Sequence, residues 1–303
     1  MNPIKFSIVI TTKNRLEELK ITLQKIENLL HQEEVEVLIY DDASDDGTFD
    51  YISNNYPQIV LLRNEKSKGL IHNRNRLNQL AKGEYLISLD DDLHFLTQNP
   101  LEIIENYFLQ NSRCGVVSFR VFWSRQEPES HFTTDQPEIV KSFIGCGHCF
   151  RKAAWEAIPD YPDWYIFYGE ETFAAMNLFK NQWEVHYLPT VLVNHRVELK
   201  KRYIASNDFG IRYRRAIRAD WFNMMLLYPI SKIPRILSYS IWMQYKTKIF
   251  KGDFRVIKPL FLAKWDLITH FGKIVRHRNA LTLEEYQKYT KLKEAKIYWK
   301  PEN

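Results

Sequence analysis

Short apolar runs alternate with amphipathic stretches along the first ninety residues. The apolar runs predict strands, and apolar residues spaced three or four apart predict helices between them. The expected strands are 5–10, 34–40, 59–62 and 84–89, and the expected helices are 16–31, 49–56 and 69–83. This order predicts an α/β fold with a mostly parallel, Rossmann-like sheet and helices on both of its faces.

The pattern is more mixed after residue 92. Asn99 and Pro100 suit the N-cap and first position of a helix. Beyond residue 200, long basic and aromatic helices are expected, interrupted by Pro229, Pro234 and Pro259. Between these regions we expect strands at 114–123, 142–150, 183–188 and 191–195, a polar loop at 124–140, and a helix at 172–180.

Charge is distributed unevenly along the chain. Residues 1–195 contain 18 Lys and Arg against 28 Asp and Glu, whereas residues 196–303 contain 24 against 9. An acidic body with a basic tail predicts two functional parts, and the basic part predicts an anionic partner. Tryptophans within this part favour interfacial helices on an anionic membrane surface. A helical extension with a solvated basic face stays an alternative, and no nucleic-acid module is recognised.

Cysteine usage and hydropathy favour a cytoplasmic protein. Three cysteines, at 114, 146 and 149, predict no disulfide framework. The N-terminal apolar run is too short for a signal-peptide core, and no run approaches the ~18 apolar residues that span a bilayer. Cys146 and Cys149 lack a second ligand pair nearby, so a zinc site is not expected there. The expected location is the cytoplasm, with peripheral contact to the inner face of the membrane.

Three consecutive carboxylates, Asp90, Asp91 and Asp92, follow the fourth expected strand. Side chains alternate across a strand, so Asp90 and Asp92 are expected on one face and Asp91 on the other. Two carboxylates on one face suit a hard divalent cation, Mn²⁺ or Mg²⁺, which would share a diphosphate. A solvated acidic loop is the alternative.

The segment DDASDDGT at 41–48 follows the second expected strand. Its spacing partly matches a calcium-binding EF-hand loop, but Ser53 stands where a bidentate Glu is needed and the preceding segment is a strand. Calcium sensing is therefore excluded. A turn rich in Asp and Gly is the simple interpretation, and Asp42 could accept hydrogen bonds from a base or ribose.

Taken in order, five segments resemble family 2 of the inverting glycosyltransferases. They are SIVITTKNR, DDASDDGT, GLIHNRN, GEYLISLDDD, and FYGEET followed by Asn194 and His195. The resemblance covers roughly residues 5–196 and implies a GT-A type fold that uses nucleotide-diphosphate sugars. It implies a catalytic domain at 1–198, divided into a nucleotide-sugar half (1–92) and an acceptor half (93–198), and a basic helical extension at 199–303.

The resemblance also implies roles for individual residues. Thr11 and Asp42 would contact the base and ribose, Arg74 would lie near the base and diphosphate, and Asp91 would contact the ribose. Asp92 would ligate the metal, with Asp90 or His195 assisting. The remaining expected donor-binding residues are Thr12, Asn14 and Arg15.

The catalytic base of the family is the second acid of a Glu-Asp pair, and this chain has Glu170-Glu171 there. Glu171 would take the role of base, on a side chain one methylene longer. Independently, Gly169 permits a tight turn, and acids at a helix start are favoured by the helix dipole, which also explains the pair as simple capping. The Arg usually found six residues after the base is Asn177 here. The acceptor pocket is expected to include Gly147, His148, Trp164 and Glu170.

These residues predict a metal-dependent, inverting glycosyltransferase. The expected donor is a UDP- or dTDP-sugar, and the acceptor is a hydroxyl of a saccharide or lipid-linked molecule in surface polysaccharide or glycoconjugate assembly. Two alternatives are a nucleotidyltransferase, although TTKNR lacks the glycines of such a loop, and a non-catalytic sugar- or membrane-binding scaffold of the same fold. The oligomeric state stays open.

Overall fold

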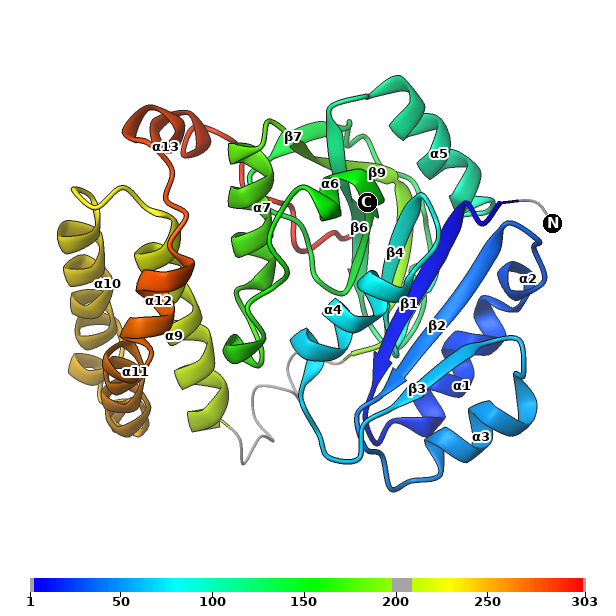
Figure 1. Ribbon diagram of the computed structural model, residues 1–303, viewed down its shortest axis with the longest axis horizontal. Coiled ribbons are helices and arrows are strands. Elements are labelled where there is room, and N and C mark those ends of the chain that lie inside the picture. The colour runs from blue at the N-terminus through cyan, green and yellow to red at the C-terminus, as the bar shows by residue number, and fades with distance from the viewer. Residues whose placement is uncertain (1–2, 198–208, 302–303) are drawn as a thin grey trace.

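The first part of the chain forms four parallel strands that alternate with helices, as predicted. The structure is a computed structural model that describes residues 3–197 and 209–301. Strand β1 pairs with β2 and β4, and β2 pairs with β3, all in parallel (Figure 1). The expected helix 16–31 divides at Ile26, whose backbone leaves the helical region (φ −104°, ψ 12°). The elements are β1 (Phe6–Thr12), α1 (Leu16–Lys25), α2 (Glu27–Leu30), β2 (Val35–Asp41), α3 (Thr48–Asn55), β3 (Val60–Arg63), α4 (Leu70–Leu80) and β4 (Tyr85–Asp90).

The second part extends the same sheet with mixed pairings. The strand order is β3-β2-β1-β4-β8-β6-β9-β5, and β7 pairs with β9. Among the described strands of this part, β6 and β9 pair in parallel, while the pairs β4–β8, β6–β8, β5–β9 and β7–β9 are antiparallel. The α/β fold is confirmed, with a mixed sheet. The elements are β5 (Leu93–Phe95), α5 (Pro100–Gln110), β6 (Cys114–Trp123), β7 (Glu138–Val140), β8 (Gly147–Arg151), α6 (Lys152–Glu156), η1 (Asp163–Tyr165), α7 (Glu170–Lys180) and β9 (Glu184–His195).

Some strands in this part differ from the prediction. The expected strand 142–150 is shortened to β8, because residues 141–146 leave the sheet as a loop. The two expected strands at 183–195 are one strand, β9, with an irregular register against β6. Strands β5 and β7 were not predicted, since three residues are too few to show an alternating pattern.

The two faces of the sheet have separate cores. Ile8 and Ile10 of β1 pack in one core with Leu19 and Leu23 of α1. Val9, between them in the sequence, packs in the other core. This alternation gives three layers, with α1, α3 and α5 on one face of the sheet and α4, α6 and α7 on the other.

Helices of the C-terminal part form a further layer beyond α7 (Figure 1). Helix α9 connects the two parts, because Ala219 and Phe222 belong to the core around α7 while Ile217 and Trp221 pack with α10 and α11. None of the described helices has both the length and the apolar composition needed to cross a bilayer. The elements are α9 (Phe209–Leu227), α10 (Ile233–Thr247), η2 (Ile249–Lys251), η3 (Phe254–Val256), α11 (Ile257–Thr269), α12 (Phe271–His277) and α13 (Leu283–Tyr289).

Prolines start these helices rather than interrupt them, with one exception. Pro234 and Pro259 lie in the first turns of α10 and α11, where a missing N–H costs no helical hydrogen bond. Pro229 lies between α9 and α10 and separates them. The prediction of interrupted helices is therefore correct only at Pro229.

The last described residues return to the sheet. The backbone N–H of Trp299 donates to Val121 O of β6 (3.3 Å), and the buried Trp299 ring lies 4.3 Å from the Arg120 guanidinium. Lys141 N–H donates to Lys293 O (2.9 Å). The end of the C-terminal part thus packs against the sheet of the first part. The expected domain boundary at 198/199 lies outside the described residues.

Candidate active site

The carboxyl ends of three neighbouring parallel strands place polar residues at one edge of the sheet. Thr11 of β1 is level with Asp90 of β4, and Thr12 is level with Asp41 of β2. Ligands of open α/β sheets bind at this edge, beyond the carboxyl ends of the strands. The pattern of strand ends therefore brings distant segments of the sequence into one site.

The three consecutive aspartates have different partners. Asp91 accepts hydrogen bonds from Thr12 Oγ1 (2.8 Å) and Arg15 Nε (2.8 Å), and burial raises the pKa of Asp91 to about 7. Asp92 accepts from Arg15 Nη2 and lies 2.9 Å from His195 Nε2. Asp90 accepts from Arg74 Nη2 (3.1 Å). Asp91 and Asp92 lie in the turn after β4, where Arg15 pairs with both, so the expected separation of Asp91 by strand alternation does not apply to them.

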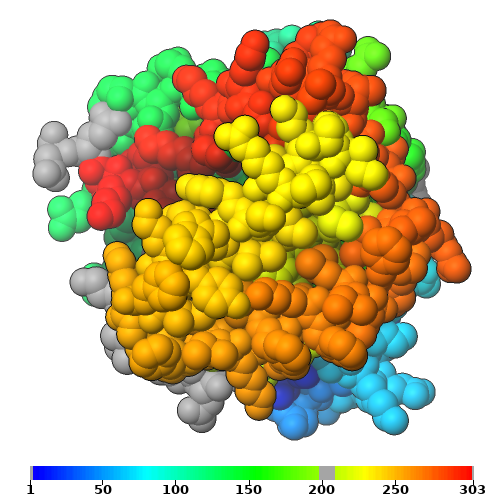
Figure 2. Space-filling model, turned by 90° about the vertical axis from the view of Figure 1, so that its left-hand side faces the viewer, coloured from blue at the N-terminus to red at the C-terminus, as the bar shows by residue number. Residues whose placement is uncertain are grey.

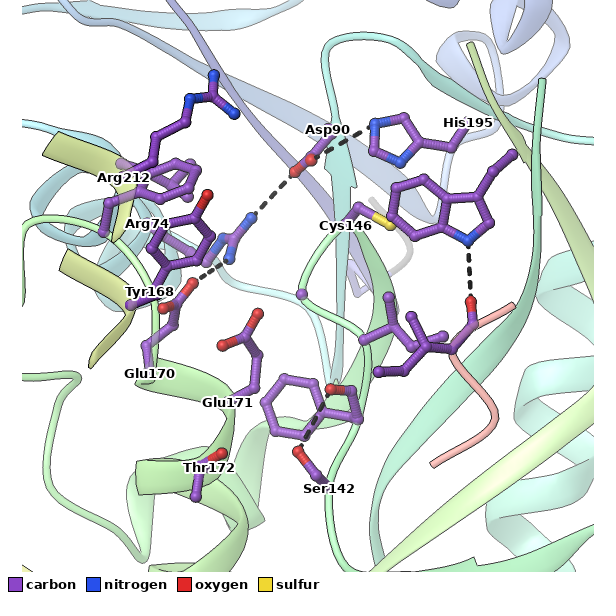
Figure 3. Close-up of a pocket in the computed structure, with 18 of the residues that line it drawn as sticks. Arg74, Asp90, Ser142, Cys146, Tyr168, Glu170, Glu171, Thr172, His195 and Arg212 are labelled. Atoms are coloured by element: carbon purple, nitrogen blue, oxygen red, sulfur yellow. Dashed lines mark hydrogen bonds and ion pairs between the residues drawn. The ribbon is translucent and has the colours of Figure 1, made fainter. Parts of the chain in front are cut away.

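Asp90, Asp92 and His195 form a set of potential cation ligands. One ligand atom from each residue lies within 4.8 Å of the other two. His195 Nε2 is 4.0 Å from Asp90 Oδ2, and Figure 3 shows the ring directed at that carboxylate. Two carboxylate oxygens and one imidazole nitrogen suit Mn²⁺ or Mg²⁺. The donor set therefore fits the expected cation.

Asp42 is held within its own loop. Its carboxylate accepts from Asn64 Nδ2 (2.8 Å), Ser67 Oγ (2.6 Å), Lys68 N (2.8 Å) and Gly69 N (3.0 Å). Although burial opposes ionisation, these donors lower the pKa of Asp42 to about 2. Four hydrogen bonds fill the lone pairs of a carboxylate. Asp42 thus holds the β3–α4 loop in place beside the strand ends.

Arg74 connects the aspartates to α7. Its buried guanidinium bonds Asp90 on one side and lies 3.5 Å from Glu170 Oε1 on the other (Figure 3). Gly169, with a φ of 85°, is the N-cap of α7, so the helix starts with Glu170 and Glu171 beside this cation. One buried arginine therefore fixes the distance between the two acidic groups.

Glu171 projects into the cavity beside Glu170 (Figure 3). Burial, followed by the charge of Glu171, raises the pKa of Glu170 to about 8, and burial also raises the pKa of Glu171. The Glu171 carboxylate lies directly against the Cα of Gly145, where an added Cβ would be 3.1 Å from Glu171 Cδ and would overlap the carboxylate oxygen. A side chain with a raised pKa and free space before it is suited to accept a proton.

Two cavities meet at this site. The first, of about 560 Å³, is lined by strand-end residues and the loop before α4. The second, of about 660 Å³, is lined by the start of α7 and by residues 142–146. Both are lined by Leu70, Asp90, Phe167 and His195, so two of the three potential cation ligands, Asp90 and His195, lie at their junction.

The two cavities contain most of the predicted site residues. Asn14 lies outside both, and its Oδ1 accepts from Asp45 N (2.9 Å), linking two loops. The first cavity includes Thr11, Thr12, Arg15, Asp42, Asp90, Asp91, Asp92 and His195, and the second includes Arg74, Asp90, Glu170, Glu171 and His195.

Three residues expected in the acceptor pocket lie elsewhere. Gly147 faces Leu93 and Val193 in the core, because β8 directs it away from the cavity. His148 is buried and its Nδ1 lies 3.1 Å from Ile144 O. The Trp164 ring stacks 5.5 Å from His270 of the C-terminal part. These positions correct the prediction, which read small and aromatic residues near the catalytic motifs as pocket residues.

Helix α9 contributes residues that the sequence did not indicate. Arg212 lines the second cavity and Arg215 the first, and their i, i+3 spacing places them on the same side of the helix. Arg214 and Arg218 point elsewhere and pair with Asp266 of α11. The sequence RYRRAIR shows a cluster of positive charge. The fold is needed to tell that Arg212 and Arg215 line the cavities, whereas the other two arginines pair with Asp266.

The end of the chain and an aromatic loop complete the second cavity. Ile297 and Tyr298 reach it because the C-terminal segment returns to β6, and the Trp123 indole donates to Ile297 O (2.8 Å). Phe167 and Tyr168 come from the loop before α7. No local pattern in the sequence predicted that the C-terminal pair would line this cavity.

Comparisons with known proteins find similarity to glycosyltransferases. The family model described as "Glycosyl transferase family 2" matches residues 7–157. An uncharacterized glycosyltransferase of Haemophilus influenzae is 28% identical over 147 residues, 46% of this chain and 49% of that protein. The UDP-Glc:alpha-D-GlcNAc-diphosphoundecaprenol beta-1,3-glucosyltransferase WfaP of Escherichia coli is 33% identical over 94 residues, 30% of this chain and 36% of that protein.

A solved structure extends the likeness to nearly the whole chain. The mannosyltransferase PcManGT from Pyrobaculum calidifontis, in complex with GDP-Man and Mn²⁺, superposes with a TM-score of 0.56 at 14% identity, covering 96% of this chain and 79% of that one. At this identity the likeness concerns the fold. The matches cover half or less of the length of the curated relatives named above.

The hydrogen bonds of Asp42 predict a pH-dependent contribution to stability. At pH 7, Asp42→Asn should lower the free energy of unfolding by about 1–3 kcal/mol, because buried donors lose their acceptors. The folded pKa of about 2 lies below the ordinary value of 3.8, so this difference is full above about pH 4 and disappears as pH falls toward 2. Urea unfolding at pH 7, 5 and 3 measures it, with the exposed Asp50→Asn as control. A difference that stays constant with pH would contradict the role given to the carboxylate.

Proposed function

The chain belongs, through residues 7–157, to glycosyl transferase family 2, and on that premise we propose that it transfers a sugar from a nucleotide-diphosphate donor to an acceptor hydroxyl. The observation that carries the proposal is the junction of the two cavities. A set of cation ligands, Asp90, Asp92 and His195, lies on the donor side, and Glu171 faces the neighbouring cavity. Such a junction lets two substrates meet in a fixed orientation.

The donor occupies the cavity at the strand ends. We take a UDP- or dTDP-sugar as the donor, and WfaP, whose name includes UDP-Glc, supports the first of these. Mn²⁺ or Mg²⁺, held by Asp92 with Asp90 and His195, would supply positive charge to the diphosphate. Lys13, Arg15 and Arg215 line the same cavity and add to that charge.

The acceptor occupies the cavity beside α7. Its hydroxyl loses a proton to the Glu171 carboxylate as the oxygen attacks the anomeric carbon of the donor sugar. The new bond joins the acceptor oxygen to that carbon, while the bond from the carbon to the diphosphate oxygen breaks and the nucleoside diphosphate leaves. Attack opposite the leaving group inverts the anomeric configuration. The positive charge of Arg74, which lies 3.5 Å from the neighbouring Glu170, favours the ionised form of Glu171 that accepts the proton.

The aromatic lining of the second cavity supports a saccharide as the acceptor. Trp123, Tyr168 and Tyr298 line it and offer ring faces on which a sugar can stack. We propose a saccharide or lipid-linked acceptor in surface polysaccharide or glycoconjugate assembly, with the reaction on the cytoplasmic side of the membrane. The name of WfaP, which specifies a diphosphoundecaprenol-linked sugar, supports an acceptor of this class.

Substitution of the cation ligand and of the base tests the reaction. Asp92→Asn and, separately, Glu171→Gln should each lower transfer by at least about 100-fold, because each removes a charge that acts in the transition state. The measurement is release of nucleoside diphosphate from UDP- and dTDP-sugars with Mn²⁺, together with the melting temperature of each variant. The exposed Asp50→Asn is the control. Full activity in either folded site variant would remove the corresponding residue from the mechanism.

Gly145 sets the position of the base. Gly145→Ala should lower kcat by about 100-fold, because its methyl group occupies the place of the Glu171 carboxylate and moves it off line. The KM for the donor should change little, since Gly145 lines only the second cavity. Gly272→Ala is the matched control, because a Cβ there meets nothing within 4 Å. An unchanged kcat, or a loss confined to the donor KM, would show that Gly145 does not position Glu171.

A further inference from the structure

Exposed apolar side chains are concentrated on the C-terminal helices. Of the 22 large apolar residues that are exposed among the described residues, 11 lie between 230 and 275. Figure 2 looks onto the side of the molecule that α10 and α11 cover. We call these residues the aromatic face: Ile230, Tyr239, Trp242, Phe250, Phe254, Ile257, Phe261, Trp265, Ile268, Phe271 and Val275.

Helix α11 is apolar on two sides. Leu260 and Ala263 are buried against α9 and form the small core of these helices. On the outer side Phe261 and Trp265 are 65% and 54% exposed, one turn apart on the same stripe. A helix that is apolar on both sides is normally covered on both. The outer stripe therefore indicates a second contact.

The residues around α11 extend this stripe into a surface. Phe250 and Phe254, each 66% exposed, lie on the short helical turns that connect α10 to α11. The Trp242 ring of α10 contacts Phe250 with a centroid distance of 5.7 Å. Phe271 continues the surface onto α12. An apolar surface formed by several elements is typical of a contact with another molecule or a membrane.

Positive charge surrounds the aromatic face. Residues 229–278 contain eleven Lys and Arg against two acidic residues. Both acids are already paired, Asp266 with Arg214 and Asp253 with Arg255. The exposed cations are Arg235, Lys246, Lys251, Arg255, Lys258, Lys273 and Arg276. The partner of this surface should therefore be both apolar and anionic.

We propose that the aromatic face docks onto the surface of an anionic lipid bilayer. Exposed Phe and Trp rings among Lys and Arg are the composition of helices that lie in the membrane interface. Helix α11 has 13 residues and is about 20 Å long, shorter than the ~30 Å hydrocarbon layer, so it lies along the surface. A second copy of the chain fits less well, since a symmetric contact would bring two strongly basic surfaces together.

Docking would hold the active site next to lipid-linked molecules. Helix α9 packs against α11 and also supplies Arg212 and Arg215 to the two cavities, so the aromatic face and the site share one rigid element. This consequence rests on the proposed function, whereas binding to the bilayer does not.

Sedimentation with lipid vesicles tests the docking. The full chain should bind phosphatidylglycerol vesicles at 50 mM NaCl, bind phosphatidylcholine vesicles at least tenfold more weakly, and lose most of the binding at 500 mM NaCl. The double variant Phe261→Ser, Trp265→Ser should bind phosphatidylglycerol at least tenfold more weakly. The control is Leu109→Ser, Phe132→Ser, which removes residues of similar exposure (67% and 64%) on other elements and should bind like the wild type.

Three results would overturn the proposal. The first is no binding to phosphatidylglycerol vesicles at low salt. The second is equal binding by the Phe261/Trp265 variant and the wild type. The third is a wild-type protein that binds no vesicles and forms a dimer in sedimentation velocity, when the Phe261/Trp265 variant alone is a monomer. Melting temperature and nucleotide-sugar hydrolysis in solution should be unchanged in the variant, which shows that it is folded. Vesicle binding by a wild-type protein that hydrolyses no nucleotide sugar would refute the proposed function and leave the docking intact.

Discussion

The burial of acidic side chains at one edge of the sheet is the constraint on which the site depends. Asp91, Asp92 and Glu170 are nearly inaccessible to water, and a buried carboxylate is costly unless it is paired or protonated. Arg15 pairs with two of the aspartates, and Arg74 bridges Asp90 and Glu170. These cations hold the acids at fixed separations, so the charge that must be neutralised also determines where the two cavities meet.

The fold supplies the two sides of the site in different ways. Parallel strands form the first cavity, because their carboxyl ends reach the same edge. The second cavity is assembled from the loop at 142–146, the start of α7, helix α9 and the returning C-terminus. The C-terminal helices therefore serve the site from one side, through Arg212 and Arg215, while their other side carries the aromatic face.

The sequence predicts those parts of the fold and site that depend on neighbouring residues, and it does not predict the parts that depend on contacts between distant segments. Strand ends could be predicted, because the apolar runs before Thr11, Asp42 and Asp90 stop abruptly. The resemblance of the motifs led to Glu171, which faces the cavity. The sequence could not place Tyr298 or Arg215, because their positions depend on packing between distant segments. It also assigned His148 and Trp164 to a pocket, although β8 buries His148 and the partly buried Trp164 stacks on His270.

The central claim is that a divalent cation at Asp90, Asp92 and His195 is shared with a nucleoside diphosphate. Calorimetric titration of UDP and of dTDP, with Mn²⁺ and then with excess EDTA, tests it most directly. The account predicts that one of them binds at least tenfold more tightly with Mn²⁺, and that Asp92→Asn removes this gain. Equal affinity with and without Mn²⁺ for every nucleotide that binds, or a gain that persists in Asp92→Asn, would contradict it.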